Sequence, residues 1–174
     1  MTAYRCGRSK SIVFRKTSSE SLATETKFLT SINKTTKSLV RKKKGSYQKI
    51  KAINSYVKSR VQYDNARCRF QASDAYYQRK ATCSGYTSLM YIMLRDAGIP
   101  CRIVKNDSMN HTWILVKSGS RWYQCDPTWD DTARTTRYFM KGRSYSGHKK
   151  AYKLNSSSTK LPTIAKYSYQ YYAK

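Results

Sequence analysis

The sequence of 174 residues is poor in acidic side chains and has no long apolar run. Only 9 residues are Asp or Glu, against 35 Lys or Arg, so the formal net charge is +26. No segment approaches the roughly 20 consecutive apolar residues that a membrane-spanning helix needs. The N-terminal residues also lack the apolar core of a signal peptide. The composition therefore excludes an integral membrane protein.

Cysteine is too sparse and too irregularly spaced for a disulfide-rich scaffold or a zinc-binding module. The chain has five cysteines and no Cys-x-x-Cys pair, and the odd number leaves at least one thiol unpaired within a monomer. Cys101 and Cys125 could pair with each other, or each could be a small apolar residue of the core. We expect neither a metal centre nor a cofactor.

The aliphatic content is low, and the aromatic content compensates for it. Ile, Val, Leu and Phe together make up only 27 residues, a level that usually indicates disorder when the net charge is high. The chain also has 16 Tyr and 3 Trp, and each such side chain can bury roughly 150–250 Å². The sequence can therefore form one domain with a modest core.

Positive charge is concentrated at the two ends of the chain. Residues 1–48 hold 12 basic and 2 acidic side chains, and residues 132–174 hold 10 basic and none that are acidic. Residues 49–131 have the more balanced charge of an ordinary domain. The basic flanks would attract a polyanion such as nucleic acid, an anionic cell-wall polymer or a membrane surface. Alternatively, they only keep the protein in solution.

Apolar spacing predicts two helices before residue 64. Thr17, followed three residues later by Glu20, indicates the start of the first helix, and its apolar positions continue to Leu39. Four basic residues at 41–44 then precede Ser46, which we expect to cap the second helix. The apolar face of the second helix consists of Ile50, Ile53, Val57 and Val61.

A third helix is predicted to begin at Cys83 and to stop before Gly98 and Pro100. Residues 64–82, which precede it, have the polar and aromatic composition of a loop. The predicted buried face of the third helix consists of Tyr86, Leu89, Met90, Met93, Leu94 and Ala97.

Three strand-like runs follow the third helix, over residues 101–106, 111–117 and 121–129. Only three residues separate the last two runs, which indicates an antiparallel hairpin. Beyond Asp131 the pattern weakens, although residues 137–140 and 167–172 could add strands.

Three residue types needed for nucleophilic acyl transfer lie on three different predicted elements, at Cys83, His111 and Asp126. A cysteine at a helix start is activated, because the free N–H groups and the helix dipole stabilise the thiolate. A histidine next to it can act as a base, and a carboxylate can orient that histidine. The alternatives are a small buried cysteine and a structural His–Asp pair.

The length of the hairpin loop decides whether His111 and Asp126 can meet. A loop of two residues (119–120) or four (117–120) puts both side chains on one face of the sheet, whereas a three-residue loop puts them on opposite faces. A Cys–His–Asp site therefore requires the even loop. The second histidine, His148, lies in a basic segment without a nearby carboxylate, and we expect it at the surface.

Several segments resemble the transglutaminase-like superfamily. KATCSGYTSLMYIMLRDAGIPCRIV, NHTWILV and RWYQCDPTWDD are similar, in this order, to its three signature blocks. KIKAINSYVKSRVQYD and DAYYQRKATC resemble what precedes the nucleophile in bacterial members. The resemblance covers about residues 46–140, and we expect a basic, partly helical N-terminal extension over 1–45 and a catalytic domain over 46–174.

The resemblance implies an α+β, papain-like fold, in which the nucleophile begins a central helix packed on an antiparallel sheet. By position, Cys83 matches the nucleophile, His111 the base and Asp126 the carboxylate. One oxyanion donor is expected to be the backbone N–H of Cys83. The second donor stays open among Gln71, Tyr76, Tyr77 and Gln78. Trp113, Trp122 and Trp129 are either walls of the substrate cleft or core residues.

The implied activity is attack on a protein or peptide amide with a thioester intermediate. A lysine amine as second nucleophile would make the enzyme a protein crosslinker, and water would make it a cysteine peptidase or amidase. A third possibility is a non-catalytic module that binds a polyanion or the cell surface. Because many bacterial members are secreted or surface-attached, we expect the same location here.

Overall fold

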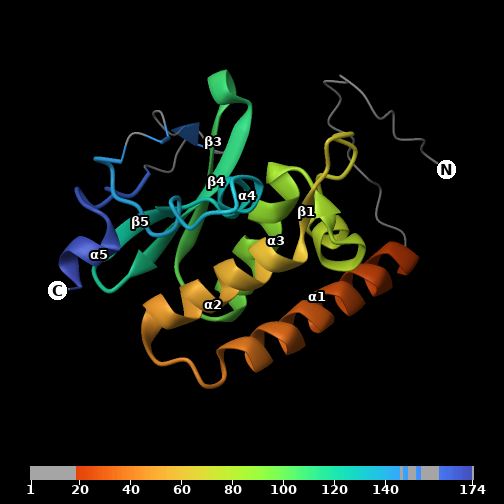
Figure 1. The fold of residues 1–174 in the computed structure, drawn as a ribbon. Helices are drawn as coiled ribbons and strands as arrows, with labels where there is room; N and C mark the ends of the chain where they lie inside the picture. Colours follow the sequence, from red (N-terminus) through yellow and green to blue (C-terminus); the bar gives the residue numbers. More distant parts are fainter. Residues whose placement is uncertain (1–18, 146, 149–151, 154–160, 174) are drawn as a thin grey trace.

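Helices pack on one face of a four-stranded antiparallel sheet in the computed structural model, which describes residues 19–145, 147–148, 152–153 and 161–173 (Figure 1). Among these residues, no helix has both the length and the apolar character needed to cross a membrane. The α+β prediction is confirmed. The elements are α1 (Ser19–Val40), α2 (Gly45–Arg60), β1 (Gln62–Tyr63), η1 (Asp74–Gln78), β2 (Lys80–Ala81), α3 (Cys83–Asp96), β3 (Cys101–Asn106), η2 (Asp107–Met109), β4 (His111–Ser118), β5 (Arg121–Cys125), α4 (Pro127–Thr132), β6 (Tyr152–Lys153) and α5 (Tyr169–Tyr172).

Helices α1 and α2 form a pair that covers α3 (Figure 1). Helix α1 buries Phe28 and Ile32 in the core that it shares with α2 and α3. All four predicted apolar positions of the second helix are buried. The helices themselves are confirmed, while Thr17 lies outside the described residues. The division of the chain at residue 45 stays a prediction.

The expected cap of α2 is wrong. Lys44 occupies the N-cap position and makes no side-chain capping bond, whereas Ser46 lies within the first turn. The Ser46 hydroxyl forms a hydrogen bond of 2.8 Å with the hydroxyl of Ser118 at the end of β4. The serine therefore ties the helix to the sheet.

Helix α3 is the centre of the molecule, because it contacts both α1 and α2 on one side and strands β3 and β4 on the other. Its predicted apolar residues from Tyr86 to Leu94 are fully buried. The helix ends at the predicted place, where Gly98 adopts a φ of +74° that favours glycine. Near the other end of the helix, the Thr87 hydroxyl donates a hydrogen bond of 3.2 Å to the backbone oxygen of Thr112, which ties the first half of α3 to the start of β4.

The sheet has the strand order β5-β4-β3-β6. In the β4–β5 hairpin, Ser118 pairs with Arg121, so the loop consists of Gly119 and Ser120 alone. The prediction of an even loop is confirmed in its two-residue form. Gly119 has a φ of +60°, as tight hairpin turns require. Side chains of β4 alternate between the helix side, with Ile114, and the opposite side, with Leu115.

The strands predicted at 101–106 and 111–117 are confirmed as β3 and β4, whereas the other loop and strand predictions need correction. Residues 64–82 are not only a loop, because Gln62 pairs with Lys80 in a short parallel ladder and η1 forms a π-helical turn. Strand β5 ends at Cys125, since Asp126 and Pro127 start helix α4. Residues 137–140 form turns.

The C-terminal segment and the cysteines also differ from expectation. Tyr169–Tyr172 is the short helix α5, and Tyr169 stacks on Tyr47 with ring centroids 4.2 Å apart. Strand β6 was not predicted. Cys101 and Cys125 are buried free thiols, so the suggestion that they pair is wrong.

Candidate active site

Cys83 is the first residue of α3, in the turn where backbone N–H groups lack intrahelical acceptors. Its thiol is half-buried. Burial raises the pKa of this thiol, but hydrogen bonding to His111 and Thr112, together with the positive charge of His111, brings the pKa below its ordinary value. Position and environment therefore both favour the thiolate.

Close packing holds this helix start in place. A Cβ atom on Gly85 would lie 2.4 Å from the Cβ of Ala81 and 3.0 Å from the backbone oxygen of Gln71. Only glycine lets the first turn of α3 approach the preceding chain so closely.

His111 begins β4 directly after a tight turn. The side chain of Asn106 caps this turn by accepting a hydrogen bond from the N–H of Met109, and Asn110 is left-handed with a φ of +46°. The imidazole Nε2 lies 2.6 Å from Oδ2 of Asp126. Burial lowers the pKa of His111, but its hydrogen bonds with Asp126 and Cys83 outweigh burial and raise the pKa to about 9. The surroundings of the ring therefore favour its imidazolium form.

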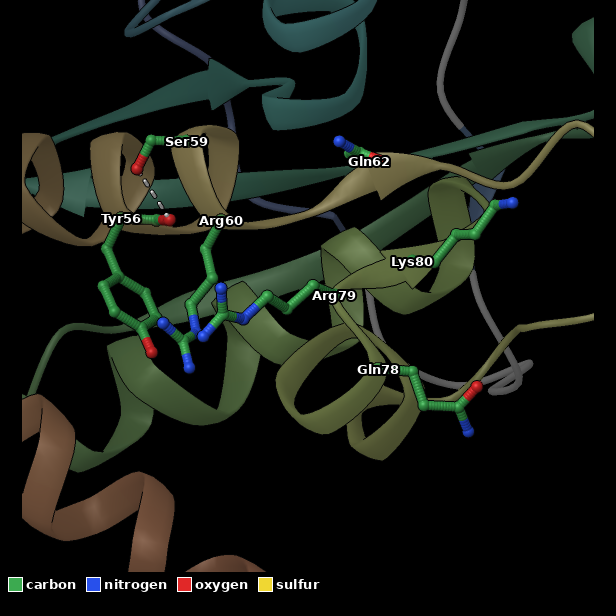
Figure 2. A pocket seen from close by; sticks show the side chains of 7 residues that line it. All are labelled: Tyr56, Ser59, Arg60, Gln62, Gln78, Arg79 and Lys80. Atoms are coloured by element: carbon green, nitrogen blue, oxygen red, sulfur yellow. Dashed lines mark hydrogen bonds between the residues drawn. The ribbon is translucent and has the colours of Figure 1, made fainter.

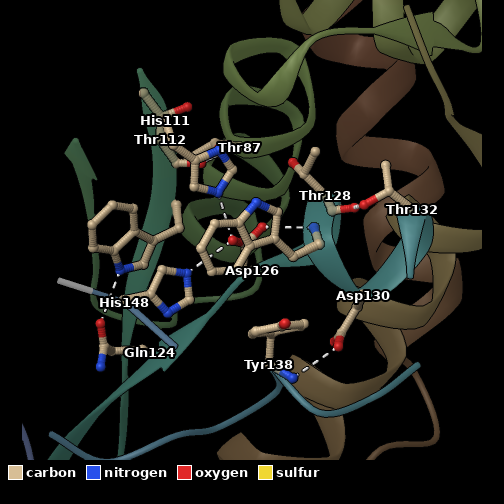
Figure 3. A network of polar contacts seen from close by, with 12 residues as sticks. Thr87, His111, Thr112, Gln124, Asp126, Thr128, Asp130, Thr132, Tyr138 and His148 are labelled. Atoms are coloured by element: carbon tan, nitrogen blue, oxygen red, sulfur yellow. Dashed lines mark hydrogen bonds and ion pairs between the residues drawn. The ribbon is translucent and has the colours of Figure 1, made fainter. Parts of the chain in front are cut away.

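Asp126 has two functions, because it both caps α4 and binds His111 (Figure 3). Its Oδ1 accepts a hydrogen bond of 3.0 Å from the N–H of Trp129, and Pro127 occupies the first helical turn. Burial raises the pKa of Asp126, yet hydrogen bonds from His111 and His148 bring it below its ordinary value. The α4 cap thus orients the buried carboxylate, and the two histidines favour its ionised form.

The structure brings Cys83, His111 and Asp126 together from the starts of α3 and β4 and the end of β5. Asp126 is fully buried and His111 is nearly so. Their catalytic roles stay predictions. The geometry nevertheless has the order that acyl transfer needs, from thiol to imidazole to carboxylate.

His148 was expected at the surface, and that expectation is wrong. It is only 8% exposed, and its Nε2 lies 2.9 Å from Oδ2 of Asp126 (Figure 3). The contact joins residues 22 positions apart, so no local sequence pattern reveals it. The one available signal was that the chain has only two histidines.

The three tryptophans differ in their relation to this cluster. The half-buried Trp129 stacks on His111, with ring centroids 4.7 Å apart and an interplanar angle of 6°. Trp113 is fully buried and donates its Nε1–H to Gln124. Trp122 packs on the apolar cluster that contains Trp113. Trp129 is therefore the tryptophan that borders the imidazole and remains partly exposed.

The residues proposed to supply the second oxyanion donor have other partners. Tyr76 forms hydrogen bonds with Thr35 and Ser31 of α1. Gln78 accepts a hydrogen bond of 2.6 Å from Arg69 and donates one to Asp74. The exposed Tyr77 contacts Phe28, and the exposed side chain of Gln71 accepts a hydrogen bond from Ser73. None of these recorded contacts is with Cys83 or His111.

A separate cavity of about 550 Å³ lies beside the end of α2, at the η1 turn (Figure 2). Arg60 and Arg79 lie next to each other there, beside the ring of Tyr56 (Figure 2). No carboxylate is among the residues that line this cavity, which are Tyr56, Ser59, Arg60, Gln62, Gln78, Arg79 and Lys80. The cavity is therefore strongly basic.

His111, Asp126 and His148 are the described group with the closest approach to a metal-ligand set, since their ligand atoms lie within 4.8 Å of one another. The N–O separations of 2.6 and 2.9 Å are those of direct hydrogen bonds. Tetrahedral zinc with ligands at about 2.0–2.2 Å needs ligand atoms roughly 3.3 Å apart. The observed spacing fits a hydrogen-bonded cluster.

Comparison with known proteins gives one family and several structural neighbours. The model of the transglutaminase-like superfamily matches residues 33–127, which is more than half of the chain. No functionally curated protein matches.

Solved structures with similar folds include a candidate cysteine protease from Cytophaga hutchinsonii, with 22% identity and a TM-score of 0.49 over 57% of this chain and 37% of that one. A TGase has 18% identity and a TM-score of 0.49 over 64% and 34% of the two chains. The periplasmic domain of TgpA from Pseudomonas aeruginosa, bound to ethylmercury, has 17% identity and a TM-score of 0.48 over 61% and 46%. The chain thus spans less than half the length of each.

Proposed function

Because the chain belongs to the transglutaminase-like superfamily, we propose that it catalyses cysteine-dependent acyl transfer from a protein or peptide amide. The observation that carries the proposal is the continuous contact from the Cys83 thiol through His111 to the buried Asp126 carboxylate. The lowered pKa of the thiol and the raised pKa of the imidazole are those of a thiolate–imidazolium pair.

In the first half-reaction, the Cys83 thiolate attacks the carbonyl carbon of the amide and forms a tetrahedral oxyanion. The backbone N–H of Cys83 at the helix start would donate to that oxyanion. When the C–N bond breaks, His111 transfers its proton to the leaving nitrogen, and a thioester on Cys83 remains. The carboxylate of Asp126 keeps His111 oriented throughout.

In the second half-reaction, His111 accepts a proton from the second nucleophile, which attacks the thioester and releases the thiolate. We propose a lysine amine as this nucleophile, so that the product is a glutamine–lysine crosslink. Water in the same position would make the protein a cysteine peptidase or amidase. The two reactions share the acyl-enzyme and differ in the exclusion of water.

A thiol-labelling experiment tests the site without a known substrate. We expect iodoacetamide to modify Cys83 rapidly below pH 7, read by peptide mass spectrometry, and His111→Ala to abolish this acid-side reactivity. The buried thiols of Cys101, with a pKa raised to about 12 by burial, and Cys125 are internal controls that should stay unmodified. A Cys83 that reacts as an ordinary thiol regardless of His111 overturns the proposal.

A second experiment separates the acceptors. An N-blocked glutamine peptide is supplied with hydroxylamine as amine probe, and the hydroxamate and the hydrolysed acid are both quantified. Acyl transfer predicts an excess of hydroxamate, hydrolysis predicts an excess of acid, and Cys83→Ala should form neither. If the wild-type protein forms neither product although Cys83 is reactive, the substrate is a different amide.

The basic cavity favours an anionic partner as a further part of the proposal. Arg60, Arg79 and Lys80 line a cavity that has no carboxylate in its lining. These basic side chains would attract an anionic cell-wall polymer or another polyanion. Such a polymer fits the secreted or cell-surface location that we propose. We expect retention on heparin to weaken when Arg60 and Arg79 are both changed to Gln. Unchanged retention would assign polyanion binding to other basic residues.

A further inference from the structure

Two histidines bind the same oxygen of Asp126. Oδ2 lies 2.6 Å from Nε2 of His111 and 2.9 Å from Nε2 of His148, while Oδ1 accepts the N–H of Trp129. The two imidazole rings are nearly parallel, with an interplanar angle of 9° and centroids 6.2 Å apart. Three groups thus contact the carboxylate, and the proposed reaction uses only one of them.

Aromatic rings fix the orientation of His148. Its ring stacks on Trp113 and Trp129, with centroids 4.5 and 4.6 Å away, and the ring of Tyr138 meets it edge-on at 5.9 Å. Two hydrogen bonds hold the Tyr138 backbone in turn, because its N–H donates to the Asp130 carboxylate (Figure 3) and its carbonyl oxygen accepts the N–H of Asp126. His148 can hardly turn away from the carboxylate.

The surroundings also select the tautomer of His148. Its buried Nδ1 has no hydrogen-bond partner among the described residues, whereas its Nε2 faces a carboxylate oxygen. A hydrogen on Nε2 is therefore the arrangement that satisfies the site. In that state His148 donates to Asp126 and cannot accept from it. The titratable groups recorded in contact with the His148 ring are Asp126, His111 and Tyr138.

We propose that His148 is a positioning residue, which keeps Oδ2 of the Asp126 carboxylate directed at Nε2 of His111 and so sustains the thiolate–imidazolium pair. This inference rests on the proposed function. Without His148, Oδ2 would contact only the reacting ring of His111, so the carboxylate could rotate about its Cβ–Cγ bond together with that ring. A second donor on Oδ2, from a residue outside the reaction, limits this rotation. Loss of the His148 donor would weaken the contact to His111, and the imidazolium with it.

The experiment compares two substitutions that separate the ring from the donor. His148→Phe keeps an aromatic ring between the tryptophans but has no N–H. His148→Gln loses the ring, while its amide nitrogen reaches the position of Nε2 and keeps the donor. Iodoacetamide labelling of Cys83 in the intact protein is measured at pH 6 and at pH 9 for both variants, wild type and His111→Ala.

We expect His148→Phe to move the acid limb of Cys83 labelling to higher pH by about one unit, which lowers the pH 6 rate about ten-fold. The pH 9 rate should change little, because an ordinary thiol is then largely ionised. His148→Gln should recover most of the pH 6 rate. A loosened fold would instead expose Cys101 and Cys125 to the reagent at both pH values.

The outcomes distinguish this inference from the proposed function. An unreactive Cys83 in wild type overturns both. A reactive Cys83 whose ratio of pH 6 to pH 9 rates is the same in His148→Phe as in wild type overturns the role of His148 alone. In wild type, ¹⁵N spectra of labelled histidine should show the Nε2–H form of His148. The Nδ1–H form would also overturn it, without any variant.

Discussion

The two faces of the four-stranded sheet differ in what covers them and in what they carry. The face toward the helices contributes Ile114, Val116, Tyr123 and Cys125 to a continuous apolar core. The opposite face has a small apolar cluster of Val104, Trp113 and Leu115. Next to that cluster lie the buried polar side chains His111, Gln124 and Asp126.

Alternation along single strands produces this difference. Consecutive residues of β4 point to opposite faces, so Ile114 joins the helix-side core while its neighbours Trp113 and Leu115 join the small cluster. Stability and chemistry can therefore be changed separately along one strand. The helix face contributes to the large apolar core, and the opposite face carries the hydrogen-bonded side chains of His111, Gln124 and Asp126.

Neighbouring truncations on β4 give the largest expected effect and the sharpest test of the comparison. Ile114 and Leu115 are both fully buried, on opposite faces. We expect Ile114→Ala to lower the free energy of unfolding by about 4 kcal/mol and Leu115→Ala by about 2 kcal/mol, because the smaller cluster can collapse around the cavity. Urea denaturation measures both. Equal losses would mean that the two faces stabilise the fold alike.

Removal of the Asp126 carboxylate, on the face of the sheet opposite the helices, should affect the reactivity of Cys83 more than the stability of the fold. We expect Asp126→Ala to lower the Cys83 labelling rate at pH 6 at least about 100-fold, since the imidazolium loses its anionic partner. It should also lower the free energy of unfolding by about 1–2 kcal/mol through loss of the α4 cap.

Asp126→Asn is the matched control for the carboxylate. The amide oxygen can still accept the N–H of Trp129 and cap α4, so the free energy of unfolding should fall less than in Asp126→Ala. The labelling rate at pH 6 should stay at least about ten-fold low because the negative charge is gone. A wild-type rate in this variant would show that orientation alone suffices.

The sequence was sufficient to predict the helix face and the first members of the site. Apolar spacing located α2 and α3, because both helices bury one continuous stripe. An even number of residues in the β4–β5 loop predicted that His111 and Asp126 lie on the same face of the sheet, and the two-residue loop confirms this. These predictions depend on the local spacing of residues, which can be read directly from the sequence.

The polar face could not be predicted to the same extent. His148 reaches Asp126 through the irregular chain after α4, where neither helical nor strand periodicity constrains the path. Tyr169–Tyr172 has strand-like composition, yet it forms a helix because Tyr169 packs on Tyr47 and Tyr123. Long-range aromatic packing decided both cases, and local propensity is a weak guide against it.

A smaller loss of stability is expected from a substitution in the first turn of α3, next to Cys83. Gly85→Ala should lower the free energy of unfolding by about 1–3 kcal/mol, because its Cβ would lie 2.4 Å from that of Ala81. Ala81→Gly in the same chain should recover part of the loss, as it removes the atom in conflict. Thermal unfolding of both variants measures this. Absence of recovery would assign the cost to the Gln71 backbone, 3.0 Å from the same position.

The smallest expected effect is a change in how the free energy of unfolding depends on pH, through His111 and Cys83. His111 has a pKa raised to about 9, so its contribution to stability is complete below its unfolded value of about 6.5 and is lost as pH rises through 9. Cys83, with a lowered pKa, contributes with the opposite sign, because its share is lost as pH falls. The two contributions partly cancel in wild type. In Cys83→Ser the cancellation disappears, and the free energy of unfolding should fall more steeply as the pH rises above 6.5. In ¹⁵N spectra the His111 ring of this variant should titrate about one unit lower than in wild type, since the contact with the thiolate is gone. An unchanged titration would mean that Asp126 alone holds the proton on His111 and that the thiol is not electrostatically coupled to it.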